Sequence, residues 1–471
     1  MSESYEYHKT TRSVCPVCHE IIPAKVIFKG AGVYLMKHCR VHGDFRSVIE
    51  RDRARYLESF STGKPAVYPL AHTKSGFEGC GRSCGLCAEH QQHTCLPIIE
   101  ITDYCNMTCP VCLVDNAHQT HMSVSDFSAI IESLIRCEGT LDLINLSGGE
   151  PTMHPDLLRL IDLARRPEIV NCSISTNGRI FLKNRGLLDG LIERGVFISL
   201  QFDGFDDRAY REIRGEPLLE EKHAILELLE RAGAKTSLVM TVVRGVNDRE
   251  IARTADFLME HDFIKSLMIQ PIVFTNPRYP YTEDKAMTTS DVVRELCDAK
   301  RVEILPSDIT NLPCSHPTCF SLAYFLKLKD RSGFVPLTRL VDSQAYLDVI
   351  KNRTTPGLDE ESFGAIREKI YQLWSSSGSI PESEKILATI RDLLCELGKC
   401  GNHPTPQSVF SIAENAVKSI YIHSFMDAHT MDLARVMKCC TQYPTLNELT
   451  PCCMRNAGVR GAKAPASSGS N

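Results

Sequence analysis

The middle of the chain alternates short apolar runs with amphipathic stretches, from about residue 96 to residue 273. The apolar runs have the length of buried strands, whereas the amphipathic stretches repeat apolar residues at i, i+3 and i+4, as helices do. Six such repeats predict an α/β fold in which a parallel sheet curls into a partial barrel. The predicted strands are 97–102, 141–146, 171–175, 196–202, 235–243 and 266–272. The predicted helices are 127–134, 157–164, 187–192, 223–229 and 251–258.

The segments that flank this barrel have other patterns. Residues 15–53 contain alternating stretches that are typical of hairpins. Residues 360–397 are charged and helical in pattern, with a break at 375–379, and the tail is rich in small residues, Pro and Ser, which predicts disorder. We therefore expect an N-terminal module at 1–60, a linking segment at 61–95, the barrel at 96–275, a C-terminal region at 276–456 and the tail at 457–471.

Composition restricts where such a chain can act. The 471 residues carry a net charge of −5, so nothing points to broad electrostatic binding of nucleic acid or an anionic membrane. The first residues lack an apolar signal region, and no apolar run reaches the roughly 18 residues of a membrane span. We expect a cytoplasmic protein with at most peripheral membrane contact. In a reducing compartment its 21 cysteines, grouped in short-range clusters, are typical of metal ligands rather than disulfides.

Three cysteines follow the first predicted strand of the barrel, in the stretch Cys105-Asn-Met-Thr-Cys109-Pro-Val-Cys112. Thiolates are the soft ligands that iron–sulfur clusters need, and three close thiols on one loop can converge on one centre. A cluster bound through three of its four irons keeps the fourth iron open for another ligand. The alternative is three unrelated buried cysteines, and both the strand before them and a glycine-rich motif downstream argue against it.

A second set of metal ligands lies in the N-terminal module. Cys15-Pro-Val-Cys18 and Cys39-Arg-Val-His42 form two pairs on hairpin-like turns. Three thiolates and one imidazole at this spacing are typical of a tetrahedral zinc-ribbon or rubredoxin-like site, with coincidental turn cysteines as the alternative. Because protein fills all four positions, we expect a structural site that holds one zinc or iron ion.

The linking segment repeats the CxxxCxxC spacing with Cys80, Cys84 and Cys87. We interpret this set as ligands of an auxiliary [4Fe–4S] cluster, with Cys95 as one candidate for the fourth ligand. The opposite assignment would give the open cluster to this set. The chain order argues against it, because the glycine-rich strand follows Cys105.

Further cysteines lie beyond the barrel, as Cys314 with Cys319 and as the doublets 439–440 and 452–453. Adjacent cysteines usually point apart, so we expect one member of each doublet to bind metal. Four ligands from these pairs would complete a second auxiliary cluster, and buried structural thiols are the alternative. The predicted ligands are Cys314, Cys319, Cys440 and Cys453.

The predicted strands end in polar or glycine residues, as an active site at the carboxyl face of a barrel requires. In Ser147-Gly148-Gly149-Glu150 the glycines let the backbone approach a ligand, and Glu150 can pair with an ammonium group. A solvated glutamate and plain turns are the alternatives. The residues expected to line a cofactor or substrate are Gly148, Gly149, Glu150, Ser175, Asn177, Gln201 and Asp203.

The spacing that begins at Cys105, followed by Gly148-Gly149-Glu150, resembles the radical S-adenosylmethionine (SAM) superfamily. The resemblance implies a partial (β/α)6 barrel and a [4Fe–4S] cluster whose open iron binds SAM. It implies reductive cleavage of SAM to a 5′-deoxyadenosyl radical, with Glu150 at the amino group of SAM and segment 175–178 at its ribose or carboxylate. One departure is Val111, where many members carry an aromatic residue that packs on the adenine.

Motifs outside the barrel permit a narrower comparison. They are the CxxC…CxxHG module, the GLCxxHxxxT run, PCSHPxC, and HSFMD followed by a cysteine doublet. On these motifs the chain resembles the archaeal tetraether lipid synthase group, which was formerly assigned to pterin methylation. The resemblance spans about Cys15 to Cys453 and implies a carbon–carbon bond between the terminal methyl carbons of two lipid tails. The implied partners are SAM, a hydrophobic lipid and a reducing electron donor. Two alternatives remain: radical methylation of a pterin-type ring, and a non-catalytic iron–sulfur electron-transfer protein.

Overall fold

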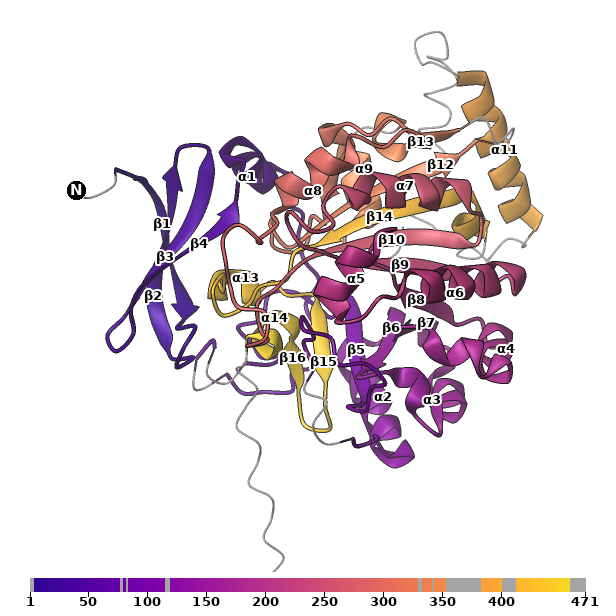
Figure 1. The fold of residues 1–471 in the computed structure, drawn as a ribbon, viewed down its shortest axis with the longest axis horizontal. Helices are drawn as coiled ribbons and strands as arrows, with labels where there is room; N and C mark the ends of the chain where they lie inside the picture. Colours follow the sequence, from indigo (N-terminus) through magenta and orange to yellow (C-terminus); the bar gives the residue numbers. More distant parts are fainter. Residues whose placement is uncertain are drawn as a thin grey trace, which may run out of the picture.

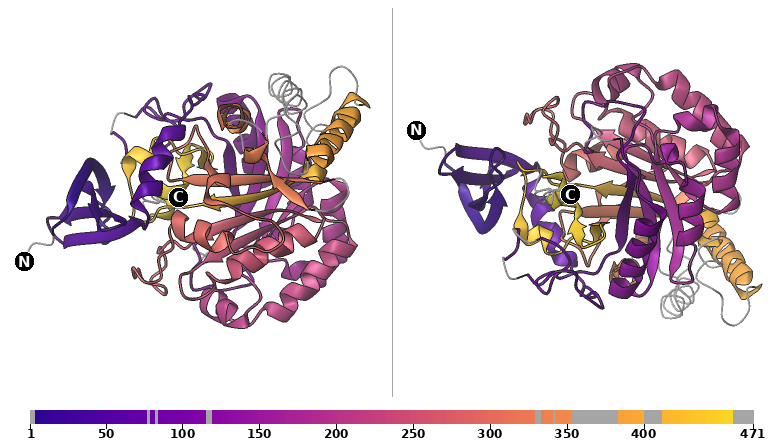
Figure 2. Two further views of the ribbon diagram at one scale, coloured as in Figure 1. Left: turned by 90° about the horizontal axis from the view of Figure 1, so that it is seen from above. Right: turned by 90° about the horizontal axis from the view of Figure 1, so that it is seen from below.

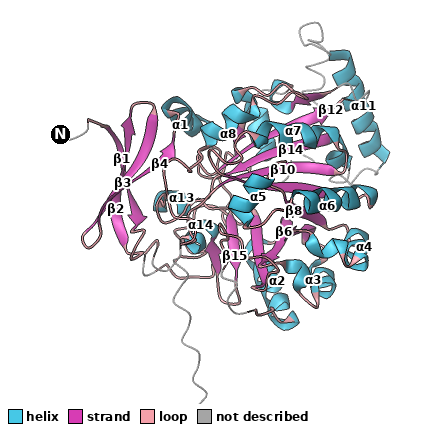
Figure 3. Cartoon of the chain, in the orientation of Figure 1, coloured by secondary structure: helices cyan, strands magenta, loops and turns pink. Residues whose placement is uncertain are grey.

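The computed structural model describes residues 4–76, 79–81, 84–114, 119–328, 333–340, 343–352, 383–399 and 412–457. The break expected at 375–379 and the tail beyond residue 457 lie outside these residues. The described chain has an α/β fold, with a small antiparallel sheet at one end and a large sheet covered by helices beside it (Figures 1 and 3). No described helix is both long and apolar enough to cross a bilayer.

The N-terminal module is a four-stranded antiparallel sheet in the order β1-β2-β3-β4. Its alternating residues bury one face, where Val26 and Leu35 pack with Tyr56 of helix α1 (Arg53–Ser59). Val14 at the end of the first strand packs against Met426 and other residues of the C-terminal segment, which lies between this sheet and the barrel (Figure 2). The strands are β1 (Glu6–Val14), β2 (Ile21–Lys29), β3 (Gly32–Cys39) and β4 (Gly43–Glu50).

Six parallel strands form the centre of the large sheet in chain order, which confirms the predicted partial barrel. Strand β8 illustrates why the sheet curls around a core. Ile198 and Leu200 are fully buried under the outer helices, while Phe197 and Ser199 face the interior of the barrel. The strands are β5 (Leu96–Thr102), β6 (Leu141–Gly148), β7 (Ile169–Thr176), β8 (Phe197–Gln201), β9 (Thr236–Val242) and β10 (Ile264–Pro271).

C-terminal strands extend this sheet at both edges. Strand β14 (Val417–His423) pairs in parallel with β10, and β15 (Thr441–Pro444) pairs in parallel with β5. Both edges of the partial barrel are therefore completed by chain from beyond residue 400, as the yellow arrows in Figure 1 show. The neighbouring strands are β11 (Thr310–Asn311), β12 (Phe320–Lys327), β13 (Phe334–Pro336) and β16 (Leu449–Pro451).

Helices cover the outer face of the barrel and include all five predicted ones. Helix α2 (Val124–Glu138) begins at Ser123, whose side chain accepts the Asp126 N–H, and its apolar stripe from Phe127 to Leu134 is buried. The other described helices are α3 (Leu157–Ala164), α4 (Arg185–Glu193), α5 (Asp207–Arg214), α6 (Leu219–Arg231), α7 (Glu250–Glu260), α8 (Thr289–Leu296), α9 (Ser343–Ile350), α11 (Ser383–Lys399), α13 (Leu433–Val436) and α14 (Cys452–Asn456), with the 3₁₀ helices η1 (Phe60–Thr62), η2 (Pro151–Met153), η3 (Arg179–Leu182), η4 (Pro306–Asp308) and η5 (Leu337–Arg339).

Candidate active site and metal centres

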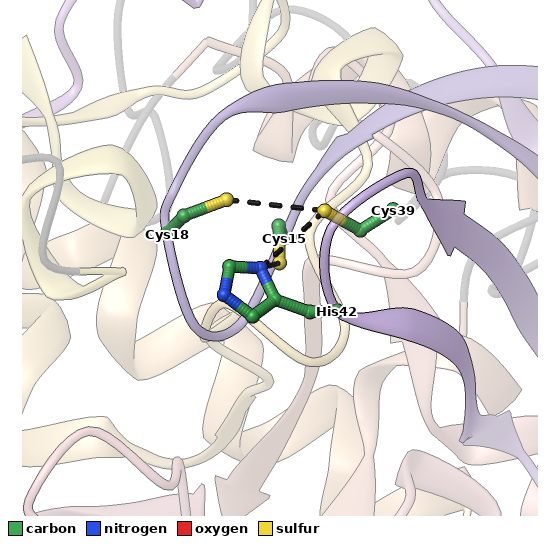
Figure 4. Close-up of side chains that lie close together, drawn as sticks. All are labelled: Cys15, Cys18, Cys39 and His42. Atoms are coloured by element: carbon green, nitrogen blue, oxygen red, sulfur yellow. Dashed lines mark hydrogen bonds between the residues drawn. The ribbon is translucent and has the colours of Figure 1, made fainter.

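The four ligand atoms predicted in the N-terminal module converge on one point (Figure 4). The Nδ1 atom of His42 lies 3.6 Å from the Cys15 sulfur and 3.5 Å from the Cys39 sulfur, and the Cys18 and Cys39 sulfurs are 3.9 Å apart. Zn–S bonds of about 2.3 Å place the sulfurs of a tetrahedron roughly 3.8 Å apart. Backbone N–H groups of Val41 and His42 lower the pKa of Cys39 to about 6. The quartet thus has the dimensions of a mononuclear metal site, and Cys39 within it favours the thiolate form.

The loop after β5 carries Cys105, Cys109 and Cys112, all half-buried. Arg278, which follows β10 in the chain, donates to the backbone oxygens of Thr108 and Cys109 at 3.1 and 2.9 Å and fixes the loop to the barrel rim. Burial raises the pKa of Cys105 to about 12. A thiolate at this depth needs a positive partner, which the iron of a cluster supplies.

The glycines before Glu150 hold this loop against the neighbouring strand. A Cβ on Gly148 would lie 2.0 Å from the Thr102 oxygen, and a Cβ on Gly149 would lie 2.3 Å from the Tyr104 oxygen. The backbone N–H groups of Gly149 and Glu150 donate to these same two oxygens, each at 2.7 Å. Side chains are therefore excluded here because two backbones touch, and the contact sets the position of the cysteine loop.

Glu150 is buried, with 1% of its surface exposed, and its carboxylate is fixed on both sides. Its Oε1 accepts hydrogen bonds from Thr152 and from the Thr176 hydroxyl, and its Oε2 accepts the Asn177 N–H at 2.7 Å. Each carboxylate oxygen has two acceptor positions, so Oε2 keeps one for a further donor. A buried, oriented carboxylate with a remaining acceptor position suits an ammonium group.

Asp203 and two buried cations form a charged group that the sequence did not reveal. Asp203 is fully buried and accepts two hydrogen bonds from Arg214, at 2.7 and 2.9 Å, while Gln201 donates to its Oδ2. Arg214 also contacts the thiol of Cys109. Lys222 donates to the Asn177 oxygen at 2.6 Å, and burial lowers its pKa to about 7. Arg214 and Lys222 lie on amphipathic helices, where the sequence pattern alone predicts solvated charges.

A cavity of about 230 Å³ lies inside the barrel, with a mostly apolar wall. Barrels of eight strands fill this space with bulky branched residues, but here many inward residues are small. Their hydroxyl groups are largely paired within the wall: the Ser266 and Ser237 oxygens are 2.6 Å apart, and Ser175 donates to Asn145 at 2.9 Å. The barrel is hollow because serines occupy inward positions on neighbouring strands. The serines that line it are Ser173, Ser175, Ser199, Ser237, Ser266 and Ser419.

The cavity runs along the barrel axis. Gln270 lines it near the carboxyl ends of the strands, and Ser266 and Lys265 line it near the amino ends. At about 3.3 Å per residue, the strand between Ser266 and Gln270 spans roughly 13 Å. Cys95 and Cys440 also line the cavity, so a thiol group borders it.

The auxiliary cysteines gather in two places. Cys80 and Cys84 pack against the apolar cluster that contains Cys453. Cys95 contacts the thiols of both Cys314 and Cys440. Cys95 is thus placed beside cysteines from beyond the barrel, although the sequence offered it as a ligand for the Cys80 set.

Hydrogen-bond donors point at the second of these thiol groups. The Asn352 N–H donates to the Cys314 sulfur at 2.9 Å, and the Gln92 side chain donates to the Cys95 sulfur at 3.4 Å. Cys319 follows Cys314 in the chain, and the Arg435 guanidinium contacts its thiol. N–H donors directed at sulfur are a common feature of iron–sulfur sites.

Models of known protein families match two segments of the chain. Residues 99–258 match the radical SAM superfamily, and residues 7–51 match the HMPTM N-terminal zinc ribbon domain. A 7,8-dihydro-6-hydroxymethylpterin dimethyltransferase of Methanocaldococcus jannaschii is 29% identical over 95% of this chain and 93% of its own length. A GTP 3′,8-cyclase of Chlorobaculum tepidum is 29% identical over 37% of this chain and 53% of its own. Among solved structures, Streptococcus suis SuiB bound to precursor peptide SuiA superposes on 44% of this chain and 45% of its own, with a TM-score of 0.38 and 16% identity.

The matched segments coincide with elements already described. The superfamily match runs from β5 to α7 and contains the Cys105 loop and Glu150, while the zinc ribbon match covers β1–β4 and the Cys15 quartet. A radical SAM domain implies a [4Fe–4S] cluster and SAM, and the three thiols and the oriented carboxylate fit both. The chain therefore contains a radical SAM domain at residues 99–258, with a zinc ribbon at residues 7–51 before it, and is a radical SAM enzyme.

Proposed function

We propose that this radical SAM enzyme forms a carbon–carbon bond at an unactivated carbon of an elongated apolar substrate, joining lipid tails. The observation that carries the proposal is the hollow, mostly apolar barrel interior that ends near the radical SAM site. No acid or base activates a saturated methyl carbon, so a radical that abstracts hydrogen is the chemistry such a substrate needs. When bound, the cluster and SAM supply that radical.

The chain's own residues orient the cofactor and exclude water. In this proposal Cys105, Cys109 and Cys112 hold the cluster, and Glu150 accepts the amino group of SAM through its remaining acceptor position. Asp203, fixed by Arg214, shapes the adjacent wall. The paired hydroxyls of the barrel wall offer few partners to water, which keeps a carbon radical away from other hydrogen donors.

We further propose two auxiliary [4Fe–4S] clusters. One set comprises Cys80, Cys84 and Cys87, with Cys453 nearby, and the other gathers Cys95, Cys314 and Cys440 near Cys319. Cys95, Cys314 and Cys440 would hold the second cluster beside the cavity, where it would supply one-electron chemistry for the coupling of two tails. Cys95 and Cys440 border the cavity, as this role requires. An external electron donor and at most peripheral contact with a membrane belong to the same proposal.

Methylation of a pterin-type ring is the second candidate function. The comparisons favour it, because the relative that aligns over 95% of this chain carries the name of a pterin dimethyltransferase. Both candidates form a carbon–carbon bond, and they differ in the substrate.

The test compares both substrates with the same protein. Full-length chain is expressed with archaeal-type or branched-chain lipids available, and extracts are examined by mass spectrometry for coupled tails. Purified reduced enzyme is separately given SAM and 7,8-dihydro-6-hydroxymethylpterin. Coupled tails that disappear in Cys105→Ala support the proposal. Unchanged lipids alongside a methylated pterin would establish the second candidate instead.

A further inference from the structure

Arg435 is a buried cation among the auxiliary thiols. It belongs to the short helix α13, and only 8% of its surface is exposed. One Nη2 hydrogen bond goes to the Ser424 oxygen, and the guanidinium also contacts the Cys319 thiol. Cys453 and Cys439 are close enough to interact with its charge. The positive charge therefore lies where cysteines from three separate segments meet.

No ion pair joins Arg435 to a carboxylate within the described part of the chain. The two acidic residues of its own segment are engaged elsewhere. Asp427 accepts from the Phe274 N–H at 2.8 Å and from neighbouring backbone groups, and Asp432 accepts from Thr11 and lies 3.8 Å from Lys9. The Nε of Arg435 is buried without a hydrogen-bond partner. A buried guanidinium without a counter-ion is strongly unfavourable, and the thiols beside it can compensate it once they bind metal as thiolates.

The two histidines beside Arg435 carry no charge that would replace it. Lys9 and Lys438 are the other cations that act on His316. His423 is buried, and its pKa falls to about 3 because burial and the nearby Arg435 charge both oppose protonation. Burial likewise places the pKa of His316 well below its ordinary value. Both imidazoles are neutral at physiological pH, whereas a guanidinium stays protonated.

We propose that Arg435 is the counter-cation of Cys319 and Cys453, which lie at the two auxiliary sites, and that its charge sets the reduction potential of the auxiliary clusters beside it. This role rests on the auxiliary clusters of the proposed function. Net charge and hydrogen bonds to sulfur set the potential of an iron–sulfur cluster. A positive charge against the ligands stabilises the reduced cluster, so its removal makes reduction harder. Arg435 is a positioning residue in this proposal, because it acts on the cluster and touches no substrate.

The test is a redox titration followed by low-temperature electron paramagnetic resonance. Full-length protein is prepared anaerobically in a Cys105→Ala background, so that the auxiliary clusters alone give signals. Arg435→Gln removes the charge, and Arg435→Lys keeps it. Arg339→Gln is the matched control, because that guanidinium pairs with Asp308 and Glu303. Iron content is measured for every variant.

We expect Arg435→Gln to lower the reduction potential of one auxiliary cluster by at least about 59 mV, which is a tenfold shift toward the oxidised form for a one-electron couple. Arg435→Lys should stay near the parent, and Arg339→Gln should match it. Loss of iron in Arg435→Gln together with retained iron and potential in Arg435→Lys also supports a role of the charge. Equal potentials at equal iron content overturn the role, as does loss of the cluster in both Arg435 variants.

Iron content of the unaltered chain separates this proposal from the proposed function. Iron for a single cluster would overturn the auxiliary assignments and, with them, the role of Arg435. The formation of coupled tails or of a methylated pterin would still be judged by product analysis alone.

Discussion

Filling the barrel cavity is the most direct perturbation of substrate binding. Ser199 faces the cavity from the middle of β8. In Ser199→Leu the longer side chain occupies the space of about three methylene groups, each of which stabilises a buried tail by roughly 0.8 kcal/mol. The loss of roughly 2.4 kcal/mol corresponds to a decrease of about 50-fold in kcat/KM for an apolar substrate. The fold should tolerate the change, because the added carbons enter a space that already exists.

The assay measures coupled lipid and 5′-deoxyadenosine at substrate concentrations below KM, together with the thermal unfolding midpoint. Ser307→Leu serves as the control, since Ser307 is exposed in η4, away from the cavity. The expected pattern is a large loss of coupling in Ser199→Leu, an unchanged Ser307→Leu, and an unchanged or slightly higher unfolding midpoint in both. Undiminished lipid coupling in Ser199→Leu would refute the location of the tail inside the barrel.

Three further results are expected. The unfolding midpoint measured by calorimetry should fall when the zinc-ribbon ion is removed with a chelator or by Cys39→Ser, because structural metal binding contributes folding free energy directly. An unchanged midpoint would contradict a structural site. Asp203→Asn should destabilise the chain by about 3–5 kcal/mol, since it leaves the buried Arg214 charge without its partner, and chemical denaturation measures this loss. Burial lowers the pKa of Lys222 from 10.5 to about 7, so between these pH values the unfolded chain binds more protons and the contribution of Lys222 to stability rises with pH. Unfolding midpoints compared at pH 7 and pH 9 should therefore show a weaker rise in Lys222→Met than in the unaltered chain. An identical rise would refute the assignment.

The central barrel could be predicted because its elements are local. Each strand and helix from β5 to β10 has its own hydrophobic periodicity, and strands that are consecutive in this part of the chain are neighbours in the parallel sheet. The edge strands could not be predicted in this way. Strand β14 pairs with β10 across a sequence separation of about 150 residues, and β15 pairs with β5 through only two residues. Their places depend on docking of distant segments rather than on a pattern within either segment.

The same distinction applies to the site. Spacing was enough to group Cys15 with His42, and Cys105 with Cys112, because each set lies on a single turn or on adjacent hairpins. The structure brings the ligand atoms of the first set together. Cys95 could not be grouped from spacing, because its neighbours come from segments more than 200 residues away. Buried cations such as Arg435 carry no local signal either, since an arginine on a short helix looks solvated until the surrounding chain is placed.

The polar groups of the barrel wall bear on the choice between the two candidate substrates. A pterin ring exchanges hydrogen bonds with water for hydrogen bonds with protein, and each group left unpaired costs about 1–3 kcal/mol. Several wall hydroxyls are already used, such as Ser175 on Asn145 and Ser266 on Ser237. The charged and amide side chains that line the cavity, Lys265, Glu414 and Gln270, lie toward its ends. The middle of the cavity therefore offers a pterin few partners, whereas a lipid tail needs none. We therefore expect a pterin to lie near the carboxyl ends of the strands, beside Gln270, rather than at the mid-strand position of Ser199 in the same cavity. The same variant consequently discriminates between the candidates: it should lower kcat/KM for lipid coupling about 50-fold and leave methylation of a pterin unchanged.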